Sequence, residues 1–357
     1  MPSEKWGIRN NFKLDDALSA FIGERQAYAL HNSGEKHYRF VQTKAWNPER
    51  HSLGAYRPTE PLKTLFFQPR EFLGPLSSTS EQESDDRIVF GVKNCDLASL
   101  AIHDHVFLHD GCKDPFYAAA RDKTILVSSD CTDFLDVCFC PVVGEQPYPM
   151  AGYDVNICQT PIGPVLESGS DRGESLLRTA EKYLEAASPE LLNAMNKQRG
   201  KITRELTDHA AKSGLKPDVD LRGAIEGTFN SSLWDTFAAD CVECGACNFI
   251  CCTCHCFLLA DGVDAQGRAA RTKQWDACLF KDFARTAGDG NPRPRRAERL
   301  RNRFDKKFSF FPEILGKFAC DGCGRCTEAC IGKIDIRDVL RTAINEHNAL
   351  HAHPGDG

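Results

Sequence analysis

The feature of this sequence that most constrains its fold is a run of four cysteines that occurs twice. Each run has the spacing C-x2-C-x2-C-x3-C, once from Cys241 to Cys251 and again from Cys320 to Cys330. This spacing is typical of segments that bind cubane [4Fe–4S] clusters through cysteine thiolates. The sequence therefore predicts two such clusters, and a fold that brings two distant segments together around them.

Each cubane needs four thiolates, and in ferredoxins with two runs the last cysteine of each run serves the other cluster. Applied to this chain, the rule assigns one cluster to Cys241, Cys244, Cys247 and Cys330. It assigns the second cluster to Cys320, Cys323, Cys326 and Cys251. Such crossed ligation would tie the two segments together and hold the clusters near each other, as electron passage requires.

Two other uses of cysteine compete with this interpretation. A structural zinc needs four ligands, whereas each run holds its third and fourth cysteines in a fixed register that paired CxxC knuckles do not require. Disulfides would be the other use of the 18 cysteines in these 357 residues. The N-terminus, however, has no apolar signal core, so we expect a cytoplasmic protein, in which disulfides are rare. A non-redox zinc scaffold remains an alternative.

The first 171 residues alternate between strand and helix patterns, which predicts an α/β domain. Apolar residues at helical spacing predict a helix over 14–30. Further predicted strands lie at 37–42, 87–92 and 124–129, with a strand pair over 153–168. Predicted helices lie at 96–107, with Asp96 as N-cap, and at 114–122.

The rest of the chain has helical patterns. We expect a helical connection and linker over 172–224, a mainly α-helical, ferredoxin-like two-cluster domain over 225–340, and a flexible tail over 341–357. The segment 272–286, between the two runs, is predicted to be a helix, which favours a helical two-cluster domain over a compact β-containing one.

Features that the sequence lacks restrict the other partners and cofactors that we expect for this chain. No apolar run approaches the roughly 20 residues that cross a bilayer, so no membrane insertion is expected. Residues 291–307 carry eight basic side chains against two acidic ones, without a recognisable nucleic-acid fold. They could form a solvated helix face or a docking surface for an acidic partner. The chain has no P-loop and no G-x-G-x-x-G, so flavin and nicotinamide should bind to a partner.

The sequence resembles a known family, through motifs that occur in the same order in both halves. These motifs are "GVKNCDLASLAIHDHVFL", "DCTDFLDVCFC" with Gly144 shortly after it, "CVECGACNFICCTCHCF", "QWDAC", "NRFDKKFSFF" and "CDGCGRC". They are similar to those of the iron–sulfur subunit of anaerobic sulfite reductase and the β subunit of cytoplasmic sulfhydrogenases, over about residues 55–340. The chain departs from the bacterial ferredoxin run at Cys252 and Ile331, where a proline is usual.

The resemblance implies an electron-transfer subunit without substrate chemistry of its own. It would relay electrons between a flavoprotein subunit that uses a nicotinamide cofactor and a catalytic subunit of a multi-subunit complex. The alternative is a cysteine-rich reductase with its own catalytic cluster, for example one that reduces a disulfide.

The cysteines of the N-terminal half favour a third [4Fe–4S] cluster. Two of them follow predicted strands whose ends can converge at one edge of a sheet, and all four lie in segments that match the family. The expected ligands are Cys95, Cys131, Cys138 and Cys140. Cys112 and Cys158 lie outside the pattern and are expected to be packing residues. Four further cysteines could tune a cluster, form another site or simply pack: Cys252, Cys254, Cys256 and Cys278.

Overall fold

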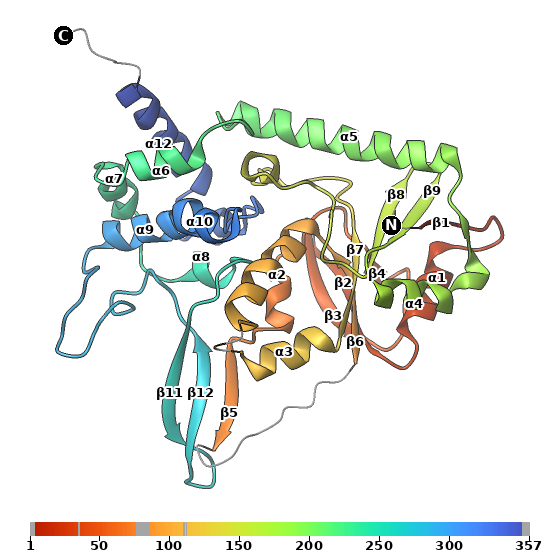
Figure 1. Ribbon diagram of the computed structural model, residues 1–357, viewed down its shortest axis with the longest axis horizontal. Helices are drawn as coiled ribbons and strands as arrows, with labels where there is room; N and C mark the ends of the chain where they lie inside the picture. The colour runs from red at the N-terminus through yellow and green to blue at the C-terminus, as the bar shows by residue number, and fades with distance from the viewer. Residues whose placement is uncertain (1–3, 35, 76–85, 110, 112, 352–357) are drawn as a thin grey trace. The chain divides into compact units, whose positions relative to one another are not determined.

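The computed structural model describes residues 4–34, 36–75, 86–109, 111 and 113–351 (Figure 1). The chain divides into two compact units, each built from more than one stretch of sequence. The first unit comprises Met1–Phe67, Glu81–Asp136 and Glu145–Leu206. The second unit comprises Gln68–Ser80, Val137–Gly144 and Thr207–Gly357, so two short segments from the first half of the chain belong to it.

A mixed sheet forms the centre of the first unit, in the order β10-β1-β9-β8-β7-β6-β2-β3, with β4 paired to β2. The inner strands β2, β6, β7 and β8 run parallel to one another, and the outer pairings are antiparallel. The strand bounds are β1 Lys5–Ile8, β2 Gln26–Gly34, β3 His37–Thr43, β4 His51–Ser52, β6 Arg87–Val92, β7 Thr124–Ser129, β8 Val155–Thr160, β9 Gly163–Ser168 and β10 Leu184–Ala186.

Helices cover this sheet and bury its apolar side chains. The apolar sides of α1 and α4 pack with strand residues such as Ile88 and Val127, all nearly inaccessible to solvent. The helices α2 and α3 connect β6 to β7 and contact each other through Phe107 and Tyr117, whose ring centroids are 5.1 Å apart. The helix bounds are α1 Leu14–Ile22, α2 Asn94–Phe107, α3 Pro115–Asp122, α4 Asp171–Thr179 and α5 Pro189–Lys212. The predicted α/β architecture is therefore confirmed.

Two local predictions in this unit are wrong. The helix predicted over 14–30 ends at Ile22, and Gln26 already begins β2, because the backbone of β2 pairs with β3 and β6. Asp96 is not an N-cap, since α2 begins at Asn94 with Lys93 in the capping position. The Asp96 carboxylate instead accepts a hydrogen bond from the backbone N–H of Leu62 at 3.1 Å.

The second unit is rich in short helices around a core that includes Trp234, Phe304 and Phe308. Its helices are α6 Leu221–Gly227, α7 Leu233–Ala239, α8 Ala246–Phe249, α9 Arg296–Asp305, α10 Phe311–Leu315, α11 Arg325–Glu328 and α12 Ile336–His351. A π-helical turn, Lys306–Phe310, joins α9 to α10.

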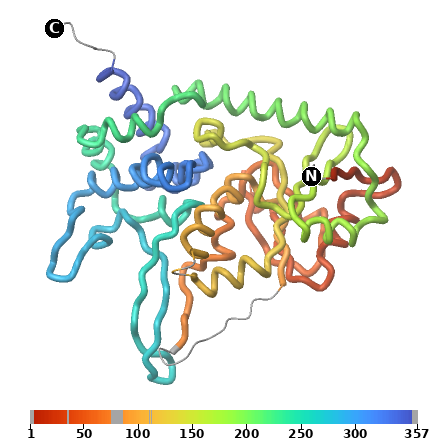
Figure 2. The backbone as a smooth tube through the Cα atoms, viewed as in Figure 1, coloured from red at the N-terminus to blue at the C-terminus, as the bar shows by residue number. Residues whose placement is uncertain are grey.

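A three-stranded antiparallel sheet also belongs to this unit, in the order β11-β12-β5 (Figure 2). Its strands are β5 Arg70–Pro75, β11 Phe257–Val263 and β12 Ala269–Trp275. The helix predicted over 272–286 is therefore wrong. Residues 272–274 pair with both β11 and β5, Trp275 pairs with β11, and turns follow. Lys273 on β12 forms a buried ion pair with Glu71 on β5 at 2.5 Å, which fixes this pairing.

The C-terminal region is helical as far as His351, so the predicted flexible tail is wrong for residues 341–351. The remaining six positions lie outside the described residues. The other predicted domain boundaries stay predictions. In the described ranges, no helix combines the length and apolarity needed to cross a membrane.

Candidate metal centre

The two cysteine runs have the same local backbone. In each run, a glycine after the second cysteine adopts a left-handed conformation, with φ of 73° at Gly245 and 69° at Gly324. A short helix follows each glycine and carries the third cysteine, Cys247 on α8 or Cys326 on α11. The repeated spacing in the sequence thus produces a repeated turn-and-helix structure.

The cysteines assigned to the first cluster surround one cavity. Its empty volume, which includes the solvent at its mouth, is about 550 Å³. The cysteines that line it are Cys241, Cys244, Cys247, Cys326 and Cys330. Apolar side chains such as Leu300 and Ile336 form much of the remaining wall. Cys330, from the distant run, therefore lies with the first three cysteines of the other run, as crossed ligation requires.

Burial and neighbouring thiols affect the acidity of these cysteines. Burial raises the pKa of Cys247 to about 12. It also raises the pKa of Cys241, and the nearby thiols of Cys330 and Cys244 add to that shift. Metal ligation would have to deprotonate these thiols, because the thiolate is the form that binds iron.

The cysteines assigned to the second cluster are also close to one another. Burial raises the pKa of Cys320 and of Cys326, and the charge of Cys251 adds to both shifts. Cys323 also contributes to the raised pKa of Cys326. Cys252 lies beside this group, with its sulfur 3.7 Å from that of Cys323. The structure thus brings Cys251 to the cysteines of the other run.

Cys251 differs from the other thiols of this group. Hydrogen bonds from the thiols of Cys252 and Cys254 lower its pKa well below the usual value, and the cations Lys307 and Arg303 act in the same direction. The same hydrogen bond with Cys251 raises the pKa of Cys252. These hydrogen bonds and cations therefore favour the thiolate of Cys251, the form that ligates metal.

Three cations of the basic segment point inward. Arg299, Arg303 and Lys307 are spaced four residues apart, and each is at most 5% exposed. The Lys307 ammonium group lies 3.4 Å from the sulfur of Cys251, and Arg303 Nη1 lies 3.4 Å from that of Cys254. Arg299 instead forms an ion pair with Glu243, inside the first cysteine run. For these three residues, a solvated or partner-facing surface is the wrong interpretation.

The electrostatics of the neighbouring cysteines favour the protonated form of Lys307. Desolvation lowers the pKa of Lys307, but its electrostatic attraction to Cys251 and Cys254 outweighs desolvation and raises the pKa overall. We did not predict from the sequence that these basic side chains face the cysteines. Their i, i+4 spacing places them on one face of a helix between the two cysteine runs, which could have indicated it.

A segment from the first half of the chain packs on the second run. The Phe139 N–H donates a hydrogen bond to the Gly322 carbonyl at 2.8 Å, and the Cys138 sulfur lies 4.0 Å from the Cys323 carbonyl oxygen. A Cβ at Gly322 would lie 2.5 Å from the backbone nitrogen of Cys140. Cys138 and Cys140 therefore lie beside the loop that carries Cys323.

The other two N-terminal cysteines lie at the sheet of the first unit. Cys95 is in the first turn of α2, just after β6, and Cys131 follows the neighbouring parallel strand β7. Burial lowers the pKa of the Lys93 ammonium between them, and the charges of Cys131 and Cys95 oppose that shift. The ends of β6 and β7 therefore lie at the same edge of the sheet, and the meeting of all four cysteines stays a prediction.

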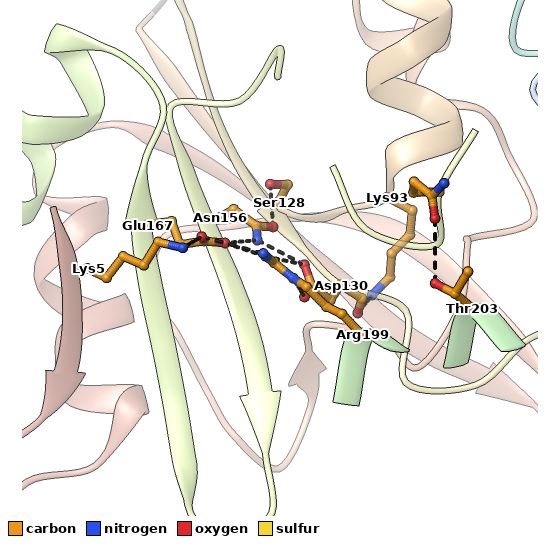
Figure 3. A network of polar contacts seen from close by, with 9 residues as sticks. Lys5, Lys93, Ser128, Asp130, Asn156, Glu167, Arg199 and Thr203 are labelled. Carbon is orange, nitrogen blue, oxygen red and sulfur yellow. Dashed lines mark hydrogen bonds and ion pairs between the residues drawn. The ribbon is translucent and has the colours of Figure 1, made fainter. Parts of the chain in front are cut away.

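A buried polar network holds this sheet edge (Figure 3). Arg199 on α5 forms ion pairs with Asp130, at 2.7 Å, and with Glu167. Asn156 donates hydrogen bonds to both carboxylates, at 2.9 and 3.1 Å. Lys93 donates to the backbone carbonyl of Asp130 at 3.0 Å. These contacts position the residue that immediately precedes Cys131.

A second cavity in the second unit contains three of the cysteines that no run accounts for, Cys254, Cys256 and Cys278. Cys158 is buried in the first unit, and Cys112 lies outside the described residues. Every cysteine in the described ranges is free of disulfides. Within those ranges, no three His, Cys, Asp or Glu side chains converge as ligands of a single metal ion.

Comparison with known proteins agrees with this geometry. Residues 240–334 match the 4Fe-4S dicluster domain family. The chain is 30% identical over 322 residues to sulfhydrogenase 2 subunit beta of Pyrococcus furiosus, covering 89% of this chain and 92% of that protein. The matched domain contains both cysteine runs, so it implies two [4Fe–4S] clusters.

Proposed function

Because the chain belongs to the family of the sulfhydrogenase β subunit and carries a 4Fe-4S dicluster domain, we propose that it relays electrons between two partner subunits. The partners would be a flavoprotein subunit that uses NAD(P)H, or a similar donor, and a catalytic subunit of an oxidoreductase complex. When bound, the clusters would supply one-electron transfer, and the residues of this chain hold, insulate and orient them.

The ligands we propose for the first cluster are Cys241, Cys244, Cys247 and Cys330. Those for the second are Cys320, Cys323, Cys326 and Cys251. The observation that carries this assignment is the cavity that Cys330 shares with the three cysteines of the distant run. The electrostatic contact of Cys251 with Cys320 and Cys326 supports the reciprocal exchange.

The surface around the first cavity has the properties expected of a contact surface for a partner subunit. Cys244 is exposed, while Val242 and Ile331 are 57% and 67% exposed, although both are apolar. Each of these two residues follows a proposed ligand of the first cluster. Apolar side chains beside an exposed ligand would let a partner exclude water and bring its own redox centre within reach.

We also propose the third cluster, with Cys95, Cys131, Cys138 and Cys140 as ligands. Cys138 and Phe139 contact the loop around Cys323, so this segment of the chain lies beside a proposed ligand of the second cluster.

Crossed ligation gives the sharpest test of this function. In the full-length chain, reconstituted anaerobically, Cys251→Ala should remove the same paramagnetic signal as Cys323→Ala. It should leave the signal that Cys244→Ala removes. Each of these variants should lose about four irons, one cubane. If Cys251→Ala instead matches Cys244→Ala, the crossing is wrong, and a colourless protein that binds zinc in place of iron would overturn the relay itself.

A further inference from the structure

We propose that the second unit holds a further iron–sulfur cluster, ligated by Cys254, Cys256 and Cys278. These residues lie outside both runs and outside the N-terminal cysteine set, so the proposal stands independently of the relay proposed above. For these three cysteines, the sequence alone was compatible with tuning a cluster, forming another site or packing, and the proposal selects the second of these roles.

The hairpin of β11 and β12 brings the three cysteines together. Cys256 directly precedes β11, and Cys278 lies shortly after β12. The first residue of β11, Phe257, pairs with the last residue of β12, Trp275. The Asp276 N–H then donates to the Cys256 carbonyl at 3.0 Å, which closes the base of the hairpin. Cysteines that are about twenty residues apart along the chain thereby line one cavity, of about 350 Å³ including its open mouth.

Hydrogen-bond donors are aimed at these sulfurs. Asn248 is 2% exposed, and its side-chain Nδ2 lies 3.1 Å from the Cys278 sulfur and 3.8 Å from the Cys254 sulfur. Arg303 reaches the Cys254 sulfur from another side, at 3.4 Å. Hydrogen bonds donated to the sulfurs stabilise cluster-bound thiolates and influence the reduction potential of the cluster.

The charges around the cavity also fit a cluster better than packed thiols. Arg303, Lys306 and Lys307 all line it. Three cations at the wall would offset the net negative charge of a cluster that is ligated by three thiolates. Protonated cysteines that merely fill space carry no charge and give no reason to place cations against them.

Three thiolates can bind three irons of a cubane, and His255 can serve the fourth. It lines the same cavity, and its Nδ1 lies 3.0 Å from the Thr253 carbonyl oxygen. A carbonyl only accepts, so Nδ1 carries the proton, and in the neutral form of this ring the lone pair would lie on Nε2. The site would therefore hold a cluster of three irons, or of four with His255 as a ligand.

Substitutions in the full-length, anaerobically reconstituted protein test this site. Cys256→Ser and Cys278→Ser should each lose about three or four irons and the same paramagnetic signal. The double variant should lose no more than either single variant. The signals that Cys244→Ala and Cys323→Ala remove should persist. Cys158→Ser, which changes a buried cysteine of the other unit, should keep all its iron.

Full iron content in both variants, or loss of the Cys323-dependent signal in place of a separate one, would overturn the proposal while leaving the relay intact. Alkylation of the unaltered protein guards against variants that fail to fold. Cys254 and Cys256 are partly exposed. They should resist iodoacetamide in the iron-loaded protein and react after chelation. If they react while all clusters are in place, they do not bind iron.

Discussion

Lys307 is a buried cation that is held in place by a cysteine loop. Its ammonium group donates to the Thr253 hydroxyl and to the Ala319 carbonyl, both at 2.7 Å, and lies against the Cys251 sulfur. A positive charge at this position stabilises the more negative, reduced state of any cluster that Cys251 ligates. The side chain therefore acts on reduction potential as well as on stability.

We expect Lys307→Met to lower the midpoint potential of the second cluster. The expected shift is about 60 mV, which corresponds to a tenfold change in a one-electron equilibrium. A redox titration followed by paramagnetic resonance would measure it. Arg301→Met removes the same charge from a more exposed side chain on α9, which bonds to the Phe229 carbonyl, and it should shift the potential much less. Equal shifts in the two variants would show that Lys307 has no special role.

At the scale of elements, the loop of the second run depends on close backbone contact with the segment Val137–Gly144. Gly322 has a φ of 63°, and a side chain there would collide with the backbone of Cys140. Gly316 has a similar φ of 66° but has open space around it. A substitution at Gly316 would therefore measure the free-energy cost of backbone strain alone. A substitution at Gly322 would measure that cost together with the cost of the collision with Cys140.

Gly322→Ala should destabilise the protein more than Gly316→Ala does. Strain alone costs about 1–3 kcal/mol at either position, and the collision adds to it only at Gly322. Denaturant unfolding of both variants would measure the difference. Gly322→Ala should also lose the iron of the proposed third cluster first, because the added methyl group would displace Cys140 and its neighbour Cys138. Equal losses of stability in the two variants would mean that the segment Val137–Gly144 moves away from the added methyl group at no cost in free energy.

Sequence patterns predicted elements well where the local signal was strong, and poorly where distant partners decided the outcome. The repeated spacing around Gly245 and Gly324 was sufficient to predict two equivalent cluster loops. The strand β12 could not be recognised, because its pairing depends on β5, which lies far away in the sequence. The inward direction of Arg303 was also hidden, since a buried guanidinium is stable only among partners that the fold supplies.

At the scale of the whole chain, α5 anchors the first unit through Arg199. This residue joins Asp130, after β7, to Glu167, on β9. Burial raises the pKa of Glu167, but its ion pair and hydrogen bonds with Arg199, with help from Lys5 and Asn156, lower it overall. The stabilisation that this depressed pKa provides is complete above pH 4.5, the ordinary value, and is lost as the pH falls through the folded-state value.

Arg199→Met should therefore cost about 3–5 kcal/mol at neutral pH, because it removes the ion-pair partner of the buried Asp130 and leaves Glu167 with Lys5 alone. The loss should shrink at acid pH, where the carboxylates of the variant are protonated. Unfolding of the variant and the parent at several pH values would measure both effects. Arg204→Met changes an exposed arginine of the same helix and should be nearly neutral. A cost at Arg199 that does not vary with pH would contradict the ion-pair account.

Arg303 lines both cavities of the second unit. With the first cluster and the further cluster proposed for the second cavity both bound, this guanidinium would change the energy of an added electron at both in the same direction, so it would have little influence on the difference between them. The driving force for a step from one site to the other depends on that difference. It must therefore come from side chains that line a single cavity, such as Lys306 at the second and Leu300 at the first. Substitution of Lys306 or Leu300 would therefore be expected to change the difference in reduction potential between the two sites. Such a change could reverse the preferred direction of electron flow without shifting both potentials together.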